Sequence, residues 1–94
     1  MIMSKTIEIK TLGITRYYKE GRLHRVDGPA IEFENGDKEY WFNGKLHRED
    51  GPAVEFINGE KMYHIDGKLH REDGPAVEFK NYHAWYNNGK RIQK

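Results

Sequence analysis

The sequence contains no cysteine, and this absence excludes both disulfide bridges and zinc sites ligated by cysteine. No apolar run approaches the length that crosses a membrane as a helix. Residues 1–5 also lack the apolar stretch of a signal peptide. We therefore expect a soluble cytoplasmic protein with no membrane contact.

The chain also has little excess charge of either sign. Its 16 Lys and Arg residues nearly cancel its 15 Asp and Glu residues, which leaves a formal net charge of +1. A nucleic-acid platform normally carries a clear basic excess on one face. The balance therefore gives no strong nucleic-acid signal, and the 94 residues provide for one small domain with a modest core.

Groups suited to covalent catalysis are equally scarce. Ser4 is the only serine, and it lies in the N-terminal segment. No Gly-rich phosphate loop precedes a helical pattern, because the glycines occupy turn positions. We expect no catalytic residue and no cofactor, so the protein is predicted not to be an enzyme.

What the sequence does contain is a cassette, GKLHREDGPAVEF, that runs from Gly44 to Phe56 and recurs unchanged over residues 67–79. An earlier version over residues 21–33 differs at three positions, which are Arg22, Val26 and Ile31. The copies start at Gly21, Gly44 and Gly67, so the period is 23 residues, which indicates a repeat protein. We divide its single domain, 1–94, into an N-terminal capping hairpin (1–20), three repeats (21–43, 44–66 and 67–89) and a C-terminal tail (90–94).

Asn-Gly or Asp-Gly dipeptides punctuate the chain at positions 35–36, 43–44, 58–59, 66–67 and 88–89. Each can supply the two positive φ angles of a type I′ hairpin turn. Short segments rich in aromatic and β-branched residues lie between them, and no segment shows a helical period. The chain is therefore predicted to be all-β and built from antiparallel hairpins.

The turns also predict which side chains share a face. If Asn35-Gly36 is a two-residue turn, Ile31 lies opposite Tyr40. The same construction pairs Val54 with Tyr63 and Val77 with Tyr86. About the second turn of each repeat, a tyrosine faces a histidine on this predicted hydrophobic face: Tyr17/His24, Tyr40/His47 and Tyr63/His70. The segment from Lys45 to Phe56 is expected to be one long strand bent at Asp50-Gly51-Pro52, or to turn a corner there.

Three histidines and three aspartates recur at the spacing His-x-x-Asp and suggest metal or acid–base chemistry: His24, His47 and His70 with Asp27, Asp50 and Asp73. Each copy offers only one His, whereas zinc normally needs three or four convergent ligands. Neighbouring copies are about 10 Å apart, estimated as two strand spacings, and cannot pool their ligands. We therefore expect no metal site, with each His packed against its Tyr and each Asp capping its Gly-Pro turn.

Three arginines at equivalent positions, Arg25, Arg48 and Arg71, could bind a phosphate or a carboxylate with two hydrogen bonds each. The alternative is a structural cross-strand pair, and the expected register places Arg48 opposite Glu39. Arg25 and Arg71 have no acidic residue opposite them in this register, so they are predicted to be more accessible to a ligand.

Variable residues at one repeated position form a second candidate surface. Tyr18, Trp41 and His64 occupy equivalent positions and are expected on the face opposite the Tyr–His row. Trp85 and Tyr82 add aromatic side chains near the C-terminus. Exposed aromatic residues and arginines are common anchors for a partner. The alternative is that these aromatic rings fill the other side of a curled sheet.

The cassette resembles the MORN family of repeats, in a divergent bacterial or phage variant that is similar to YwqK-type proteins. The shared features span residues 16–91: the period of 23 residues, the Asn/Asp-Gly turn, an aromatic residue shortly after it, and the following Asn/Asp-Gly-Lys. The chain has Asp-Gly-Pro-Ala where MORN repeats usually have Gly-x-Gly. The resemblance implies an elongated, curved, single antiparallel sheet of about three and a half repeats that serves as a scaffold or a binding surface.

We hypothesise a non-enzymatic binding module that presents a sheet face to an unidentified protein partner. The resemblance implies a bacterial or phage accessory protein, such as an antitoxin or an inhibitor of a host protein. Two alternatives stay open. In one, the arginines and histidines of adjacent repeats or of two chains bind a small anionic ligand such as a nucleotide. In the other, the open sheet edges drive self-association into a homo-oligomer.

Overall fold

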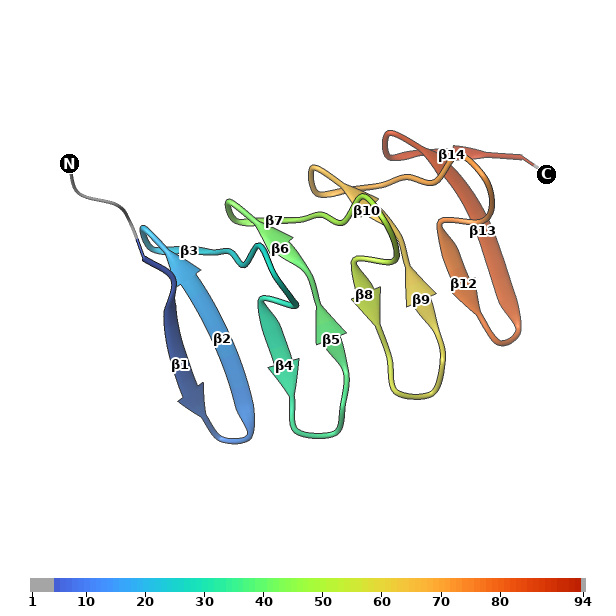
Figure 1. Cartoon of the computed structure of the whole chain (residues 1–94). Coiled ribbons are helices and arrows are strands. Elements are labelled where there is room, and N and C mark those ends of the chain that lie inside the picture. The colour runs from blue at the N-terminus through green and yellow to red at the C-terminus, as the bar shows by residue number, and fades with distance from the viewer. Residues whose placement is uncertain (1–4, 94) are drawn as a thin grey trace.

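The structure, a computed structural model, describes residues 5–93 and is all-β. Successive hairpins lie side by side along the molecule, from the N-terminal to the C-terminal end (Figure 1). The molecule is elongated, with principal dimensions of 48 × 32 × 17 Å. Residues 1–4 of the predicted capping hairpin, which include Ser4, and Lys94 of the predicted tail lie outside the described residues.

Two rows of strands run along the molecule. The first row is one open antiparallel sheet in the order β1 (Ile7–Thr11), β2 (Ile14–Lys19), β4 (Ile31–Phe33), β5 (Lys38–Glu39), β8 (Val54–Glu55), β9 (Lys61–Met62), β12 (Val77–Phe79), β13 (Tyr82–Asn87) and β14 (Lys90–Ile92). β3 (Arg22–Leu23) pairs with the end of β2. Residues 90–92, which were predicted as part of a tail, therefore form a strand.

The second row lies at one end of these hairpins. It contains β6 (Trp41–Phe42) paired with β7 (Lys45–Leu46), and β10 (His64–Ile65) paired with β11 (Lys68–Leu69). Backbone N–H groups of the turns donate to the preceding repeat at 2.8 Å: Gly44 to Leu23, Gly67 to Leu46 and Gly89 to Leu69. These hydrogen bonds join the two hairpins of the second row to each other, to β3 on one side and to the turn between β13 and β14 on the other.

The turns of the second row confirm the prediction. Trp41 lies opposite Leu46, as a two-residue turn at Asn43-Gly44 requires. Both turn residues have a positive φ, 50° and 81°, as in a type I′ turn. The predicted Tyr–His positions also face one another in the backbone, with each His N–H donating to a Tyr C=O at 3.0 Å: His24 to Tyr17, His47 to Tyr40 and His70 to Tyr63.

The turns of the first row differ from the prediction. Ile31 lies opposite Glu39 and not opposite Tyr40, because the connecting loop has three residues, 34–36. Only its last residue, Gly36, has a positive φ, of 103°. This is the other common hairpin geometry, in which a type I turn is followed by a left-handed residue. The two equivalent pairings predicted for the first row are wrong as well, since Val54 lies opposite Met62 and Val77 opposite Ala84.

A shift of one residue moves every side chain to the other face of a strand. Residues directly opposite one another share a face. One face of the first row therefore carries Ile31, Glu39, Val54, Met62, Val77 and Ala84, and the other carries Glu32, Lys38, Glu55, Lys61, Glu78 and His83. The predicted hydrophobic face, which joined Ile31 to Tyr40, is wrong because Tyr40 follows Glu39 and lies on the charged side.

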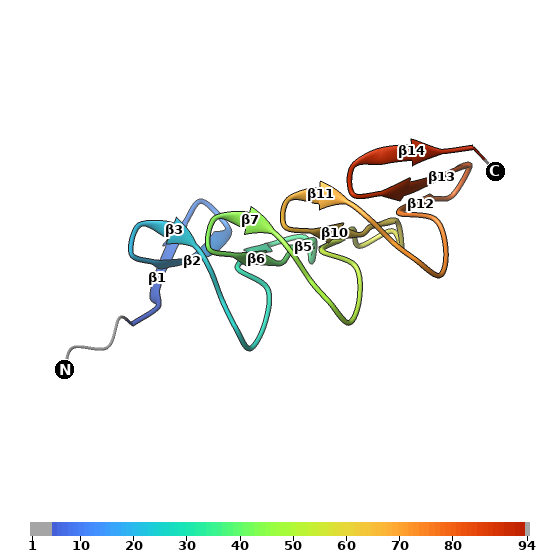
Figure 2. The same cartoon turned by 90° about the horizontal axis from the view of Figure 1, so that it is seen from above.

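Each repeat turns a corner at its Asp-Gly-Pro segment. β7 ends at Leu46 and β8 begins at Val54, so residues 47–53 form a loop and not the middle of one long strand. The equivalent loops protrude from the same side of the molecule, as Figure 2 shows. The last residue of each loop and the first residue of the strand after it form the buried core: Ala30, Ile31, Ala53, Val54, Ala76 and Val77, together with Ala84 of β13.

Candidate functional site

The arginine of each cassette stacks on a tyrosine ring. Its guanidinium carbon lies 3.9 Å from the ring centroid in all three repeats: Arg25 on Tyr17, Arg48 on Tyr40 and Arg71 on Tyr63. The quadrupole of an aromatic ring attracts a cation at this position. The tyrosines of the predicted Tyr–His row are thus partners of arginine.

The same guanidinium holds the protruding loop. In the second repeat, the Nη1 of Arg48 donates to the carbonyl of Pro52 at 3.1 Å and to the carboxylate of Glu55 at 3.3 Å, while Nε lies 3.4 Å from Asp50. Equivalent contacts join Arg25 to Pro29, Glu32 and Asp27, and Arg71 to Pro75, Glu78 and Asp73. The arginine therefore clamps the loop onto the charged face of the sheet.

These contacts correct two predictions about the arginines. Arg48 does not pair with Glu39, because its backbone N–H donates to the carbonyl of His64 in the next repeat. Arg25 and Arg71 are no more accessible than Arg48, since the three side chains are between 22% and 25% exposed. All three guanidinium groups have acidic partners of their own.

The clamp also explains the glycine of the Asp-Gly-Pro segment. A Cβ atom at Gly51 would lie 3.1 Å from the guanidinium carbon of Arg48. The corresponding distance is 3.1 Å at Gly28 and 2.9 Å at Gly74. A Cβ atom at these positions would displace the guanidinium by a few tenths of an ångström, so glycine allows its closest approach to the loop.

The three histidines join consecutive repeats. In each, Nδ1 accepts a backbone N–H from the next turn at 3.0 Å: His24 from Asn43, His47 from Asp66 and His70 from Asn88. A neutral ring with Nδ1 as acceptor carries its proton on Nε2. The ring of His24 also lies 4.4 Å from that of Phe42, centroid to centroid. Burial, with a smaller effect from the charge of Lys19, lowers the pKa of His24.

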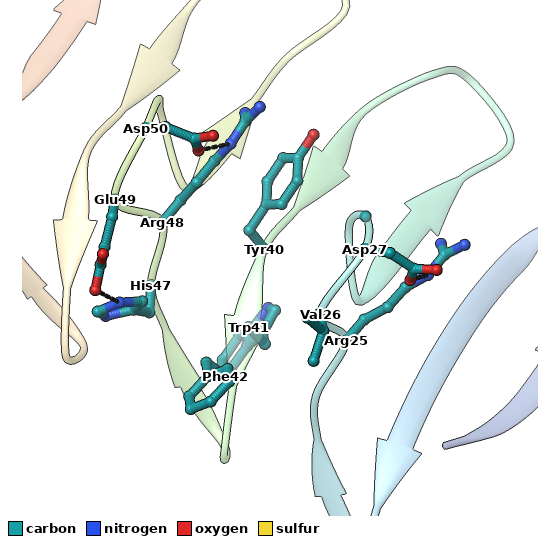
Figure 3. A pocket seen from close by; sticks show the side chains of 11 residues that line it. Arg25, Val26, Asp27, Tyr40, Trp41, Phe42, His47, Arg48, Glu49 and Asp50 are labelled. Carbon is teal, nitrogen blue, oxygen red and sulfur yellow. Dashed lines mark hydrogen bonds and ion pairs between the residues drawn. The ribbon is translucent and has the colours of Figure 1, made fainter. Parts of the chain in front are cut away.

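Two grooves separate the three protruding loops. Groove 1, of about 480 Å³, lies between the first and second loops and is lined by residues 25–28, 40–42 and 47–50. Groove 2, of about 670 Å³, lies between the second and third loops and is lined by residues 48–51, 63, 65 and 70–73. In groove 1, Val26 comes from the first loop, Glu49 and Asp50 come from the second, and Trp41 and Phe42 lie between them (Figure 3).

The side chains that differ between repeats gather in groove 1. Val26 stands where the other cassettes have Glu49 and Glu72, and it is 81% exposed. Phe42 stands where the next repeat has Ile65, and it is 45% exposed. Groove 1 therefore has an apolar wall at Val26 where groove 2 has Glu49, whereas the floor is apolar in both, with Phe42 in groove 1 and Ile65 in groove 2.

The rims of the grooves are acidic. The side chains of Asp27, Glu49 and Asp50 are more than four-fifths exposed, and so are those of Glu72 and Asp73. The arginines that also line the grooves are engaged by carboxylates and carbonyls of their own loops. The surface of groove 1 is thus an apolar floor between carboxylate rims.

The structure brings together some of the predicted site residues and separates others. Arg25, Trp41 and Arg48 line groove 1, and Arg48 and Arg71 line groove 2. Tyr18, His64 and Trp85 line neither. His64 is only 7% exposed, and burial lowers its pKa. Trp85 lies opposite Ile92 in the final hairpin.

Sequence reasoning missed Val26, Phe42 and Glu49 as groove residues. A signal for Val26 was present, because it is the one residue of the Leu-His-Arg-x-Asp-Gly-Pro-Ala segment that changes between cassettes. Phe42 gave no such signal, because the predicted register around Tyr40 was wrong by one residue. Its true position depends on the three-residue loop, which the turn dipeptide alone does not reveal.

Comparison of the chain with family models, curated proteins and solved structures gave no match. The resemblance to MORN repeats therefore stays a prediction. Within residues 5–93, no three His, Asp or Glu side chains are grouped to hold a metal ion. The same residues form no helix long and apolar enough to cross a membrane.

Proposed function

We propose that the chain is a non-enzymatic binding module for a protein partner and that groove 1, with the two loops beside it, is its contact surface. The observation that carries this proposal is an apolar surface between acidic rims, made by the exposed side chains of Val26 and Phe42 and the half-buried ring of Trp41. Buried aromatic and aliphatic anchors surrounded by a polar rim are the usual composition of a protein interface.

The variation between repeats supports the same surface. The residues are identical in all three copies of the clamp, and they build the scaffold. Val26 differs from the glutamate of the other two cassettes and Phe42 differs from the isoleucine of the next repeat, and both residues line groove 1. A scaffold that repeats while its groove residues vary suits selection of one partner at one groove.

The contacts of the arginines favour a protein partner over a small anionic ligand. Each guanidinium already has a carbonyl and carboxylates as acceptors. An incoming phosphate would have to displace these acceptors and would meet the exposed carboxylates of the rims. As the biological setting we retain a cytoplasmic accessory protein of a bacterium or phage, such as an antitoxin or an inhibitor, on the resemblance alone.

The substitution Val26→Glu tests the proposal. It gives the first cassette the residue that the other two carry, so the loop should fold as they do. The partner would be captured from a lysate by the immobilised chain, purified, and titrated calorimetrically against both proteins. We expect the wild type to bind and Val26→Glu to lose at least tenfold in affinity, because an apolar anchor is replaced by a charge.

The matched control is Leu12→Asn, which removes another exposed apolar side chain far from the groove. Leu12 has a positive φ of 50°, and Asn occupies the same position in the turns at Asn43 and Asn88. This variant should bind as the wild type does. Equal affinity of wild type and Val26→Glu, or an equal loss in Leu12→Asn, would contradict the assignment of groove 1.

A further inference from the structure

The N-terminal edge of the sheet carries an unusual strand. Within residues 5–93, β1 pairs only with β2, and all five of its residues are exposed. Ile7 and Ile9 project on one face and are 59% and 44% exposed. Glu8 and Lys10 alternate with them on the other face and form an ion pair of 3.2 Å. Long, regular edge strands with apolar side chains invite pairing with another chain.

The hairpin geometry determines which backbone groups face outward. β1 and β2 are joined by the two-residue turn Leu12-Gly13, with both φ values positive. In such a hairpin the residues that flank the turn exchange hydrogen bonds, and every second residue does the same. Ile7, Ile9 and Thr11 therefore point their N–H and C=O groups toward β2, which leaves those of Glu8 and Lys10 at the outer edge.

Charge selects one way of pairing this edge with a copy of itself. A two-fold axis through Glu8 would place like charges opposite, Glu8 against Glu8 of the second copy. An axis through Lys10 would do the same with two lysines. An axis through Ile9 places each Glu8 opposite Lys10 of the other copy, and these are the residues with outward backbone groups. Like charges opposite one another are destabilising, and opposite charges contribute favourably.

We propose that two copies of the chain associate through antiparallel pairing of their β1 strands about Ile9. Glu8 and Lys10 of one copy exchange backbone hydrogen bonds and ion pairs with Lys10 and Glu8 of the other. The two Ile9 side chains meet at the axis, where antiparallel strands bring a pair without backbone hydrogen bonds closest together. Since the strand has five residues, the interface is small and its dimer is expected to be weak.

The opposite edge of the sheet has different chemistry. β14 presents Lys90 and Arg91 with Ile92, and a copy of itself would bring like charges together. An isologous dimer is therefore expected at β1 and not at β14. Pairing of β14 with β1 of the next molecule would instead form an open chain, because a head-to-tail contact does not close.

A charge-swap experiment tests this dimer. Sedimentation equilibrium over about 10 µM to about 1 mM should show the wild type rising from 11.1 kDa toward twice that mass. Glu8→Lys and Lys10→Glu should each stay monomeric over this range, since each places like charges opposite in both pairs. An equimolar mixture of the two variants should recover the dimer, because every pair is then again Lys against Glu.

The control Lys68→Glu makes the same charge change in an exposed residue of β11 and should dimerise as the wild type does. Circular dichroism melting would establish that all three variants fold. A wild type that stays monomeric at the highest concentration would overturn the proposal. So would a mixture that fails to associate, and a mass that climbs past the dimer would show head-to-tail pairing with β14 instead.

Discussion

Arg48 shows how a single residue type organises the local structure. Its guanidinium contacts the Tyr40 ring, the Pro52 carbonyl and the carboxylates of Asp50 and Glu55. These partners come from the residue between β5 and β6, from the loop 47–53 and from β8. A planar group with several fixed donors can serve all of them at once, whereas an ammonium group cannot.

We predict that Arg48→Lys lowers the free energy of unfolding by about 1–2 kcal/mol, because the stacking and part of the hydrogen bonding are lost. Urea denaturation followed by tryptophan fluorescence would measure the change. The matched control is Arg22→Lys, which gives an exposed position the residue found in the other cassettes. If Arg48→Lys lowered the free energy of unfolding no more than Arg22→Lys does, the structural role of the clamp would be refuted.

Buried histidines make stability depend on pH. Burial lowers the pKa of both His24 and His64. A base with a lowered folded-state pKa binds fewer protons when folded, so its stabilising effect is present above the unfolded pKa, about 6.5, and is lost as the pH falls below it. We choose His64 to test this pH dependence of stability, because its buried Nδ1 has no hydrogen-bond partner in the described structure.

We therefore predict that the wild type is less stable at about pH 5.5 than at about pH 7.5, and that His64→Tyr reduces this difference. Tyrosine is the residue at the equivalent position 18. Urea titrations of both proteins at the two pH values would provide the comparison. An unchanged pH dependence in the variant would show that His64 is not a source of it.

At the scale of elements, the sequence predicted the antiparallel hairpins and three of the five turns. The dipeptides at 43–44, 66–67 and 88–89 have the geometry expected for them. The dipeptides at 35–36 and 58–59 do not, because Asn-Gly fits a two-residue turn and the end of a three-residue loop equally well. What distinguishes them is a side-chain contact: Asn35 Oδ1 accepts the N–H of Asp37 at 2.9 Å, and Asn58 accepts that of Glu60 at 3.0 Å.

The difference between a two-residue turn and a three-residue loop limited how much of the candidate site could be predicted. Arg25, Trp41 and Arg48 were identified as candidates from their repeated positions and chemistry, and the structure places them in one groove. The role of the arginines as loop clamps could not be predicted, because it depends on which face Tyr40 occupies. Nor could a groove between loops be inferred while residues 45–56 were expected to form one bent strand or a corner of unknown shape.

At the scale of the whole molecule, stability comes from repetition of small contacts. The core consists of alanines and β-branched residues in a single-layer sheet, so few large side chains are buried. Each repeat is joined to the next by turn and histidine hydrogen bonds. Such an array leaves its loops and its two edges free to contact other molecules, and the two proposals use different parts of it.

The most direct test of the central claim is amide chemical-shift mapping of the chain with its captured partner. We predict that the largest changes fall on the residues of groove 1, in the segments 25–28, 40–42 and 47–50, with smaller changes around groove 2. Changes centred on the face that carries Ile31, Val54 and Val77, or on the edge strands, would contradict the account. In that case the loops would be structural, and the partner would be recognised by the sheet itself.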